Sequence, residues 1–152
     1  MRLSAAGFDL IKHSEGFRSA QYADPAGFIT IGYGHRVSAT ESFPHGLNEA
    51  QATEILAEDV NTAEQAIARL ARVPLAQSQF DALVDFVFNL GAGRLAGSTL
   101  LKELNAGHYD AAAEQLLKWT HCGNQQSAGL KARREAEFEL WRTAAAASST
   151  AV

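Results

Sequence analysis

Residues 13–35 read HSEGFRSAQYADPAGFITIGYGH, and within this stretch a helical pattern gives way to a pattern of strand, turn and strand. The tetrapeptide 24–27 has Asp first, Pro second and Gly fourth, which are the residues that a type I turn prefers. The flanking segments, 17–23 and 28–37, are typical of strands. The sequence therefore predicts a β-hairpin directly after a helix.

The segment before the hairpin, residues 4–14, places apolar side chains at helical spacing. Ser4 is a suitable N-cap, and Gly16 suits the left-handed position that follows the end of a helix. We therefore expect a short helix that ends close to Glu15.

The segment after the hairpin predicts one long helix. A polar loop at 38–47 is followed by Asn48, which has capping-box spacing to Gln51. Apolar residues then recur every three or four positions over about 22 residues, or roughly 33 Å at 1.5 Å per residue. Pro74 ends this segment.

The chain beyond Pro74 predicts helices separated by short loops. Segment 78–90 is apolar on all sides, so we expect it at the centre of a helical lobe. Further helices are expected at 98–107, 108–119 and 129–141, with loops at 91–98 and 120–127 and a frayed tail at 144–152.

These elements together predict an α+β fold in a single domain of residues 1–152. We expect a small N-terminal lobe of about 1–47 with a helix and a β-hairpin, a connecting helix of about 48–72, and a helical C-terminal lobe of about 74–143. Two lobes joined by a helix imply a cleft between them, and clefts of that kind are favoured binding sites.

The composition excludes some classes of function. A formal net charge of −4 and a pI near 5.7 argue against nucleic-acid binding, which requires a basic face. Cys122, the single cysteine, cannot form an intramolecular disulfide; this favours a reducing compartment such as the bacterial cytosol, and its simplest role is a small semi-buried apolar residue. Charged residues interrupt the N-terminal segment, so we expect neither a signal peptide nor a transmembrane anchor.

Three polar residues of the opening stretch, Glu15, Asp24 and Thr30, are the candidate catalytic group. Glu15 stands in the last turn of a helix, where the negative end of the macrodipole favours a protonated carboxyl group that can act as a general acid. Strand alternation places Ile29 and Ile31 on one face. If both face the core, Thr30 points outward, where its hydroxyl can help Asp24 hold a water molecule.

Each of these three residues also has an ordinary structural explanation. Glu15 fits a solvated surface acid, Asp24 fits the first position of its turn, and Thr30 fits a strand. An acid that donates a proton and a carboxylate that activates water are the two groups needed to hydrolyse a glycosidic bond with inversion. Residue spacing does not choose between these explanations.

A series of motifs runs in a fixed order along the chain. The N-terminal part contains EGF at 15–17, YADPAG at 22–27 and TIGYGH at 30–35, and the C-terminal part contains FNLGAG, STLL, LLKW and GLKARREAE followed by LW. These motifs resemble those of the phage-type lysozyme family, glycoside hydrolase family 24, over residues 3–142. The resemblance implies a lysozyme-like fold.

The resemblance also implies an endolysin, a muramidase that hydrolyses the β-1,4 bond between N-acetylmuramic acid and N-acetylglucosamine in bacterial peptidoglycan for host lysis. Glu15 would be the general acid, and Asp24, helped by Thr30, would activate the attacking water, which gives inversion. Two alternatives stay open. One is a lytic transglycosylase acting on the same bond without water, and the other is a catalytically silent peptidoglycan-binding module.

Three further residues are candidates for contact with the substrate. His35 closes the TIGYGH segment, the resemblance places Asn89 where family members carry a sugar-contacting polar residue, and Trp119 can stack on a sugar ring. The structural alternatives are a histidine that satisfies a backbone group, an amide at a helix end and a core tryptophan.

The resemblance further implies that an arginine near the start of the last helix, Arg133 or Arg134, approaches Glu15. Such a partner would favour the ionised carboxylate and oppose the effect of the helix end. The alternative is that these arginines pair at i,i+4 with glutamates of their own helix.

The expected partners follow from the same resemblance. We expect glycan strands of peptidoglycan as the substrate, no cofactor, no metal ion, no nucleic acid, no stable membrane insertion and a monomeric chain. Because no export signal is expected, the protein is predicted to wait in the host cytoplasm until a separate holin lets it reach the cell wall.

Overall fold

A computed structural model describes the backbone of residues 1–150 and the side chains of residues 1–144. The chain divides into two compact units. The sheet unit comprises Ile11–Thr62, and the helical unit comprises Met1–Leu10 together with the residues from Ala63 onward.

Two helices contribute residues to both units. They are α1 (Ala5–Glu15) and α2 (Glu49–Leu70). The predicted capping box is confirmed, because the Asn48 N–H donates to Gln51 Oε1 at 2.9 Å and the Gln51 N–H donates to Asn48 Oδ1 at 2.8 Å. Gly16 follows α1 with a φ of 71°, which is the left-handed conformation expected there.

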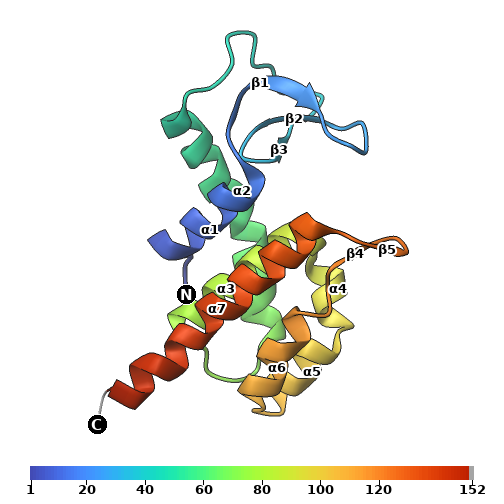
Figure 1. Ribbon diagram of the computed structural model, residues 1–152. Helices are drawn as coiled ribbons and strands as arrows, with labels where there is room; N and C mark the ends of the chain where they lie inside the picture. The colour runs from blue at the N-terminus through green and yellow to red at the C-terminus, as the bar shows by residue number, and fades with distance from the viewer. Residues whose placement is uncertain (151–152) are drawn as a thin grey trace. The chain divides into compact units, whose positions relative to one another are not determined.

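The sheet unit contains an antiparallel sheet with strand order β1-β2-β3 (Figure 1). Its strands are β1 (Arg18–Ala23), β2 (Ile29–Gly32) and β3 (His35–Arg36). The hairpin predicted around residues 24–27 is confirmed as the β1–β2 connection. The predicted strand 28–37 is instead two strands, because the chain turns back at Gly34, whose φ is 72°.

The helical unit is built around α3 (Gln77–Leu90), in which residues 80–87 are all buried, as the apolar pattern predicted. Helix α3 packs against α7 (Ala128–Thr150), and the two overlap in the view of Figure 1. The other elements are α4 (Ala92–Ala96), α5 (Thr99–Asn105), α6 (Tyr109–Leu116), β4 (His121–Cys122) and β5 (Gln125–Gln126); α5 packs against α6, and β4 pairs with β5.

Two segments predicted as loops contain regular structure. Segment 91–98 includes the short helix α4. Its glycines have low helix propensity, but the burial of Leu95 stabilises the helical turn. Segment 120–127 includes the β4–β5 hairpin. Cys122 lies on this hairpin and is exposed rather than semi-buried, since both of its strands are exposed.

The last helix is longer than predicted. We expected a helix at 129–141 and a frayed tail at 144–152, whereas α7 continues to Thr150. The physical reason is that this segment is rich in Ala, the residue with the highest intrinsic helix propensity. Residues 151–152 of the predicted tail lie outside the described residues.

Buried carboxylates of the helical unit anchor the start of the chain. The Leu3 N–H donates to Glu64 Oε2 at 2.6 Å, and the Ser4 N–H donates to Asp81 Oδ1 at 3.0 Å. The Ser4 hydroxyl donates to the other oxygen of Asp81 and accepts from the Gly7 N–H at 3.4 Å. Ser4 is therefore the N-cap of α1, as predicted, and also fixes where α1 begins.

Candidate active site

Glu15, the expected general acid, is the last residue of α1 and is half-buried in the sheet unit. Its carboxyl group lies against Gly34, in the turn between β2 and β3. A Cβ added at Gly34 would lie 2.7 Å from Glu15 Oε2, so any larger residue there would collide with the carboxyl group. The glycine thus leaves the space that this carboxyl group occupies beside the turn.

Asp24 begins the turn between β1 and β2 and is half-buried. Its Oδ1 atom accepts hydrogen bonds from the N–H groups of Ala26 at 2.9 Å and Phe28 at 2.8 Å. The turn is closed by a 2.8 Å bond from the Gly27 N–H to the Asp24 carbonyl. The structural explanation for Asp24 is therefore present in full, and it uses only one carboxylate oxygen.

The alternation argument assumed that Ile29 and Ile31 face the core and that Thr30 points outward. The structure differs from this expectation. Thr30 is 3% exposed and Ile31 is fully buried, whereas Ile29 is 47% exposed. The strand is twisted and ends in a tight turn, so consecutive residues 30 and 31 are both covered while Ile29 lies at the open start of β2. The Thr30 hydroxyl donates to the Phe28 carbonyl at 3.0 Å.

The peptide groups of Phe28 join Asp24 to Thr30. The Phe28 carbonyl accepts from the Asp24 N–H at 2.9 Å and from the Thr30 hydroxyl, while the Phe28 N–H donates to Asp24 Oδ1. Two of the three candidate residues are thus positioned by one main-chain segment. All three belong to the sheet unit.

His35 lies on β3 between two carboxylates. Its Nδ1 is 2.8 Å from Asp59 Oδ2 on α2, and its Nε2 is 3.0 Å from Glu41 in the loop after β3. Burial lowers the pKa of His35, but hydrogen bonds and charge from Asp59 and Glu41 outweigh it and raise this pKa above 6.5. Both ring nitrogens are engaged with side chains, and the predicted sugar contact of His35 stays a prediction.

The remaining predicted residues, Asn89, Trp119, Arg133 and Arg134, belong to the helical unit. Arg134 donates through Nη2 to Asn89 Oδ1 at 2.8 Å, which ties the end of α3 to α7. Trp119 meets the Phe86 ring edge-on, with centroids 5.5 Å apart. These contacts fit the structural alternatives for Asn89 and Trp119, whose sugar contacts stay predictions.

The two arginines have different partners within the helical unit. Arg133 grips Asp85 with two hydrogen bonds, Nε to Oδ2 at 3.0 Å and Nη2 to Oδ1 at 2.8 Å. Arg134, which is fully buried, pairs with Glu137 at 2.7 Å, an i,i+3 contact rather than the i,i+4 contact considered from the sequence. The expected approach of one arginine to Glu15 stays a prediction.

Burial dominates the electrostatics of this arginine cluster. It raises the pKa of Glu137 well above 4.5, helped by the nearby Asp85, and it lowers the pKa of Arg134 against the opposing charges of Glu137 and Asp85. Glu137 Oε2 and two nitrogens of Arg134 have no hydrogen-bond partner. Burying Arg134 and Glu137 therefore costs free energy of desolvation, and their hydrogen bonds compensate for it only in part.

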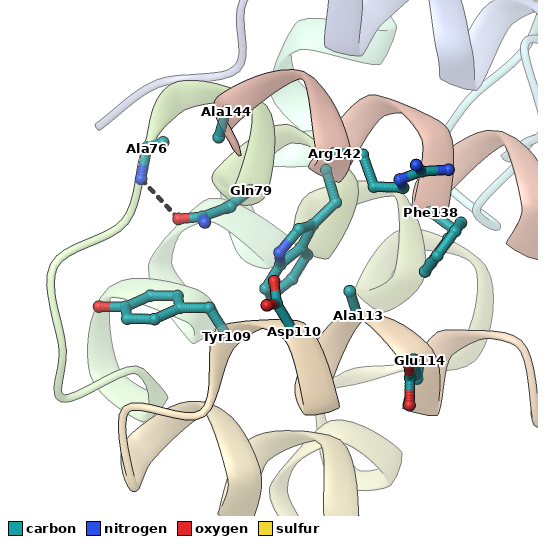
Figure 2. Close-up of a pocket in the computed structure, with 10 residues that line it drawn as sticks. Ala76, Gln79, Tyr109, Asp110, Ala113, Glu114, Phe138, Arg142 and Ala144 are labelled. Atoms are coloured by element: carbon teal, nitrogen blue, oxygen red, sulfur yellow. Dashed lines mark hydrogen bonds between the residues drawn. The ribbon is translucent and has the colours of Figure 1, made fainter. Parts of the chain in front are cut away.

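A pocket of about 640 Å³ lies elsewhere in the helical unit, between α6 and α7 (Figure 2). In Figure 2, Tyr109 and Asp110 come from α6, and Phe138 and Arg142 come from α7. None of the predicted site residues lines this pocket. Its volume therefore says nothing about the candidate active site.

Two general features are absent from the described part of the chain. No group of three or more His, Cys, Asp or Glu side chains there is arranged to hold a metal ion. No helix among those residues has both the length and the apolar character needed to cross a bilayer.

Comparison of this chain with known proteins identifies its family. The family model described as phage lysozyme matches residues 12–137. The chain is 39% identical to the endolysin of Salmonella phage P22 over 137 residues, which cover 88% of this chain and 94% of that protein. The chain belongs to the phage lysozyme family.

Solved structures of relatives agree with this phage lysozyme assignment. The crystal structure of a P22 lysozyme mutant matches with a TM-score of 0.84 and 38% identity, covering 93% of this chain and 98% of that one. The muramidase domain of SpmX from Asticaccaulis excentricus matches with a TM-score of 0.83 and 36% identity, covering 92% and 97%. The predictions of an α+β lysozyme-like fold and of a lysozyme-type glycoside hydrolase are confirmed.

One relative is much longer than this chain, and the match covers only part of it. The chain is 43% identical to the endolysin of Bacillus phage B103 over 145 residues, which cover 94% of this chain but 55% of that protein. The phage lysozyme chain thus spans about half the length of this relative.

Sequence reasoning missed several residues that shape the site. It did not find Gly34 as the support of Glu15, nor Asp59 and Glu41 as the partners of His35. The contacts of Gly34 with Glu15 and of Asp59 with His35 join separate elements, and Glu41, six residues after His35, lies in a loop without a recognisable pattern. The turn-forming motif around Gly34 was visible in the sequence. The carboxylates of α2 carried no signal that would single out Asp59.

Proposed function

We propose that this phage lysozyme is an endolysin muramidase that hydrolyses the β-1,4 bond between N-acetylmuramic acid and N-acetylglucosamine, with inversion. The observation that carries the proposal is the joining of Asp24 and Thr30 through Phe28, in the same unit that holds Glu15 against Gly34. These are the acid and the water-activating group that inverting hydrolysis requires.

In the first half of the mechanism, Glu15 donates its proton to the glycosidic oxygen as the bond to the anomeric carbon breaks. The backbone at Gly34 limits where the carboxyl group can lie, so the proton is presented from a defined direction. The leaving sugar departs as a neutral alcohol.

In the second half, water attacks the anomeric carbon from the opposite face and Asp24 accepts its proton. The turn hydrogen bonds use Asp24 Oδ1, which leaves Oδ2 to act as the base. The Thr30 hydroxyl donates its hydrogen bond to the Phe28 carbonyl, so its oxygen lone pairs can accept a hydrogen bond from the second hydrogen of the water. Both protons of the water are thereby directed, and its oxygen lone pair can point at the sugar.

The place of action follows from the family. Endolysins act on peptidoglycan, and some relatives, such as the protein of Escherichia phage Mu at 37% identity, carry the name SAR-endolysin. We propose that this protein also acts on the cell wall as a monomer. The need for a separate holin, and storage in the host cytoplasm, stay predictions that lysis of cells expressing the protein with and without a holin would test.

Mass spectrometry of fragments released from purified peptidoglycan tests the proposed reaction, with Glu15→Gln as the control. We expect fragments with hydrated N-acetylmuramic acid at the reducing end, absent with the variant. Anhydro ends would make the protein a lytic transglycosylase, and no fragments at all would make it a silent binding module. The anomer released first, followed by NMR, distinguishes inversion from retention.

A further inference from the structure

A second pocket of the helical unit has a composition unlike the rest of this acidic chain. It has a volume of about 330 Å³ and lies where the end of α2 meets α4 and α5. Three of its lining residues, Arg69, Arg72 and Lys102, are cationic, and none is acidic. Such a concentration of positive charge stands out in a protein with a formal net charge of −4.

These three cations have no ion-pair partner among the described residues. Among other exposed cations of the helical unit, Arg2, Lys131 and Arg142 each have a carboxylate within 4.0 Å, whereas Arg94 and Lys118 also lack one among the described residues, so it is the grouping of the three around one hollow that sets them apart. Like charges that surround one hollow repel one another, and an anion placed among them relieves that repulsion. The pocket is therefore suited to a negatively charged ligand.

The pocket is also held in shape by hydrogen bonds. Asn105, at the end of α5, accepts from the Arg72 N–H at 2.8 Å and donates to the Leu70 carbonyl at 3.0 Å. Ser98, another lining residue, is buried, and its hydroxyl donates to the Leu95 carbonyl at 2.7 Å. The backbones that carry the three cations are thus fixed together, so less order must be gained when a ligand binds.

A purely structural role explains only part of this arrangement. Arg69 lies in the last turn of α2, where a cation interacts favourably with the helix dipole. Arg72 lies beyond that helix and Lys102 comes from another, so the dipole of α2 does not account for all three. Two guanidinium groups and an ammonium group are the set that recognises carboxylates and phosphates.

We propose that this pocket binds an oxyanion, a carboxylate or a phosphate, carried by the cell-wall polymer, and so helps to hold the enzyme on the wall between cleavage events. The identity of the polymer rests on the proposed muramidase function, whereas the anion site itself does not. The two sources of the oxyanion are stem-peptide carboxylates and wall phosphates.

The anion site is tested first with inorganic phosphate alone, titrated into the full chain and followed by amide NMR. We expect saturable shifts at residues 69–72 and 97–105. In the variant Arg69→Gln/Arg72→Gln/Lys102→Gln, binding should weaken at least about tenfold, since charge-assisted hydrogen bonds are lost. The control Lys118→Gln/Lys131→Gln/Arg142→Gln removes the same charge elsewhere in the helical unit and should bind like the parent.

The result that overturns the proposal is equal phosphate binding by the pocket variant and the control, or no saturable shift in the parent chain. Lys102→Gln alone, on an exposed position, repeats the test if the triple variant is unfolded. This experiment does not depend on hydrolysis, so it can succeed even if the muramidase proposal fails.

The wall arm uses co-sedimentation with purified sacculi, in a Glu15→Gln background that prevents digestion. We expect the pocket variant to bind sacculi less tightly than the control. If hydrofluoric acid treatment of the sacculi abolishes this difference, the ligand is a wall phosphate; if capping the carboxylates with ethanolamine abolishes it, the ligand is a carboxylate. Either result supports the proposal, and a difference that survives both treatments overturns it.

Discussion

In the helical unit, Arg134 and Glu137 pair where solvent does not reach them, whereas in the sheet unit Glu15 and Asp24 are half-buried and lie against the main chain. The buried pair has lost its hydration, so removing one partner leaves a charge with nothing to compensate it. The sheet-unit carboxylates keep access to water. We infer that this buried charge pair of the helical unit serves folding, while Glu15 and Asp24 of the sheet unit serve the reaction.

The largest expected effect is on activity: the substitution Asp24→Asn in the sheet unit should reduce hydrolysis and leave stability almost unchanged. The amide oxygen of Asn can still accept from the turn N–H groups, so stability should change little, but the base is lost and hydrolysis should fall about 10²–10⁴-fold. Turnover of peptidoglycan and thermal unfolding measure the two quantities. Unchanged turnover would remove Asp24 from the mechanism.

Arg134→Met should have the reverse profile, a loss of stability as its main effect. Breaking a buried pair costs about 3–5 kcal/mol, which urea unfolding measures directly. The loss should be constant below the raised folded pKa of Glu137 and should grow as the pH rises above it. The charge of Arg134 lowers this pKa, so its removal makes the folded carboxyl group still harder to ionise. The double variant Arg134→Met/Glu137→Leu should recover most of the stability; equal losses in both variants would argue against the pair.

Gly34→Ala tests whether the main chain positions the acid. A non-glycine residue at a φ of 72° costs about 1–2 kcal/mol, and the new Cβ would also displace the Glu15 carboxyl group. Gly107→Ala is the matched control, because Gly107 lies in the helical unit and has a φ of 82° and nothing within 4 Å of the added Cβ. Both variants should lose similar stability, but only Gly34→Ala should lose activity, by about tenfold or more.

The smallest effect is expected at His35, whose pairing is partly exposed to solvent. Its raised folded pKa means that it stabilises the protein fully below pH 6.5, and that this contribution is lost as the pH rises through the folded pKa. We expect His35→Asn to cost less than about 1 kcal/mol, with the cost visible at about pH 5.5 and absent at high pH. A loss that does not vary with pH would show that packing, rather than charge, holds this histidine.

The elements with local signals were predictable from the sequence. The turn at Asp24, the capping box of Asn48 and the apolar surface of α3 each depend on residues close together in the chain, and the structure has all three. The burial of Thr30 was not predictable from alternation, because twist and a tight turn override a period of two in a strand of four residues.

The buried charges of the helical unit were not predictable for a different reason. Asp85 and Arg133 are 48 residues apart, and a charged residue in a sequence is ordinarily placed at the surface. Only the packing of α3 on α7 brings these two side chains together inside. Long-range pairs of this kind need the structure.

Phe28 shows how a position can be indispensable while its side chain is dispensable. The residue is 48% exposed and its ring lies under the guanidinium group of Arg36, but its peptide N–H and carbonyl connect Asp24 to Thr30. An alanine scan would pass over this position, since almost every substitution preserves the main chain. Proline alone removes the N–H, so tolerance of many side chains and intolerance of one imino acid would be the genetic signature of this connection.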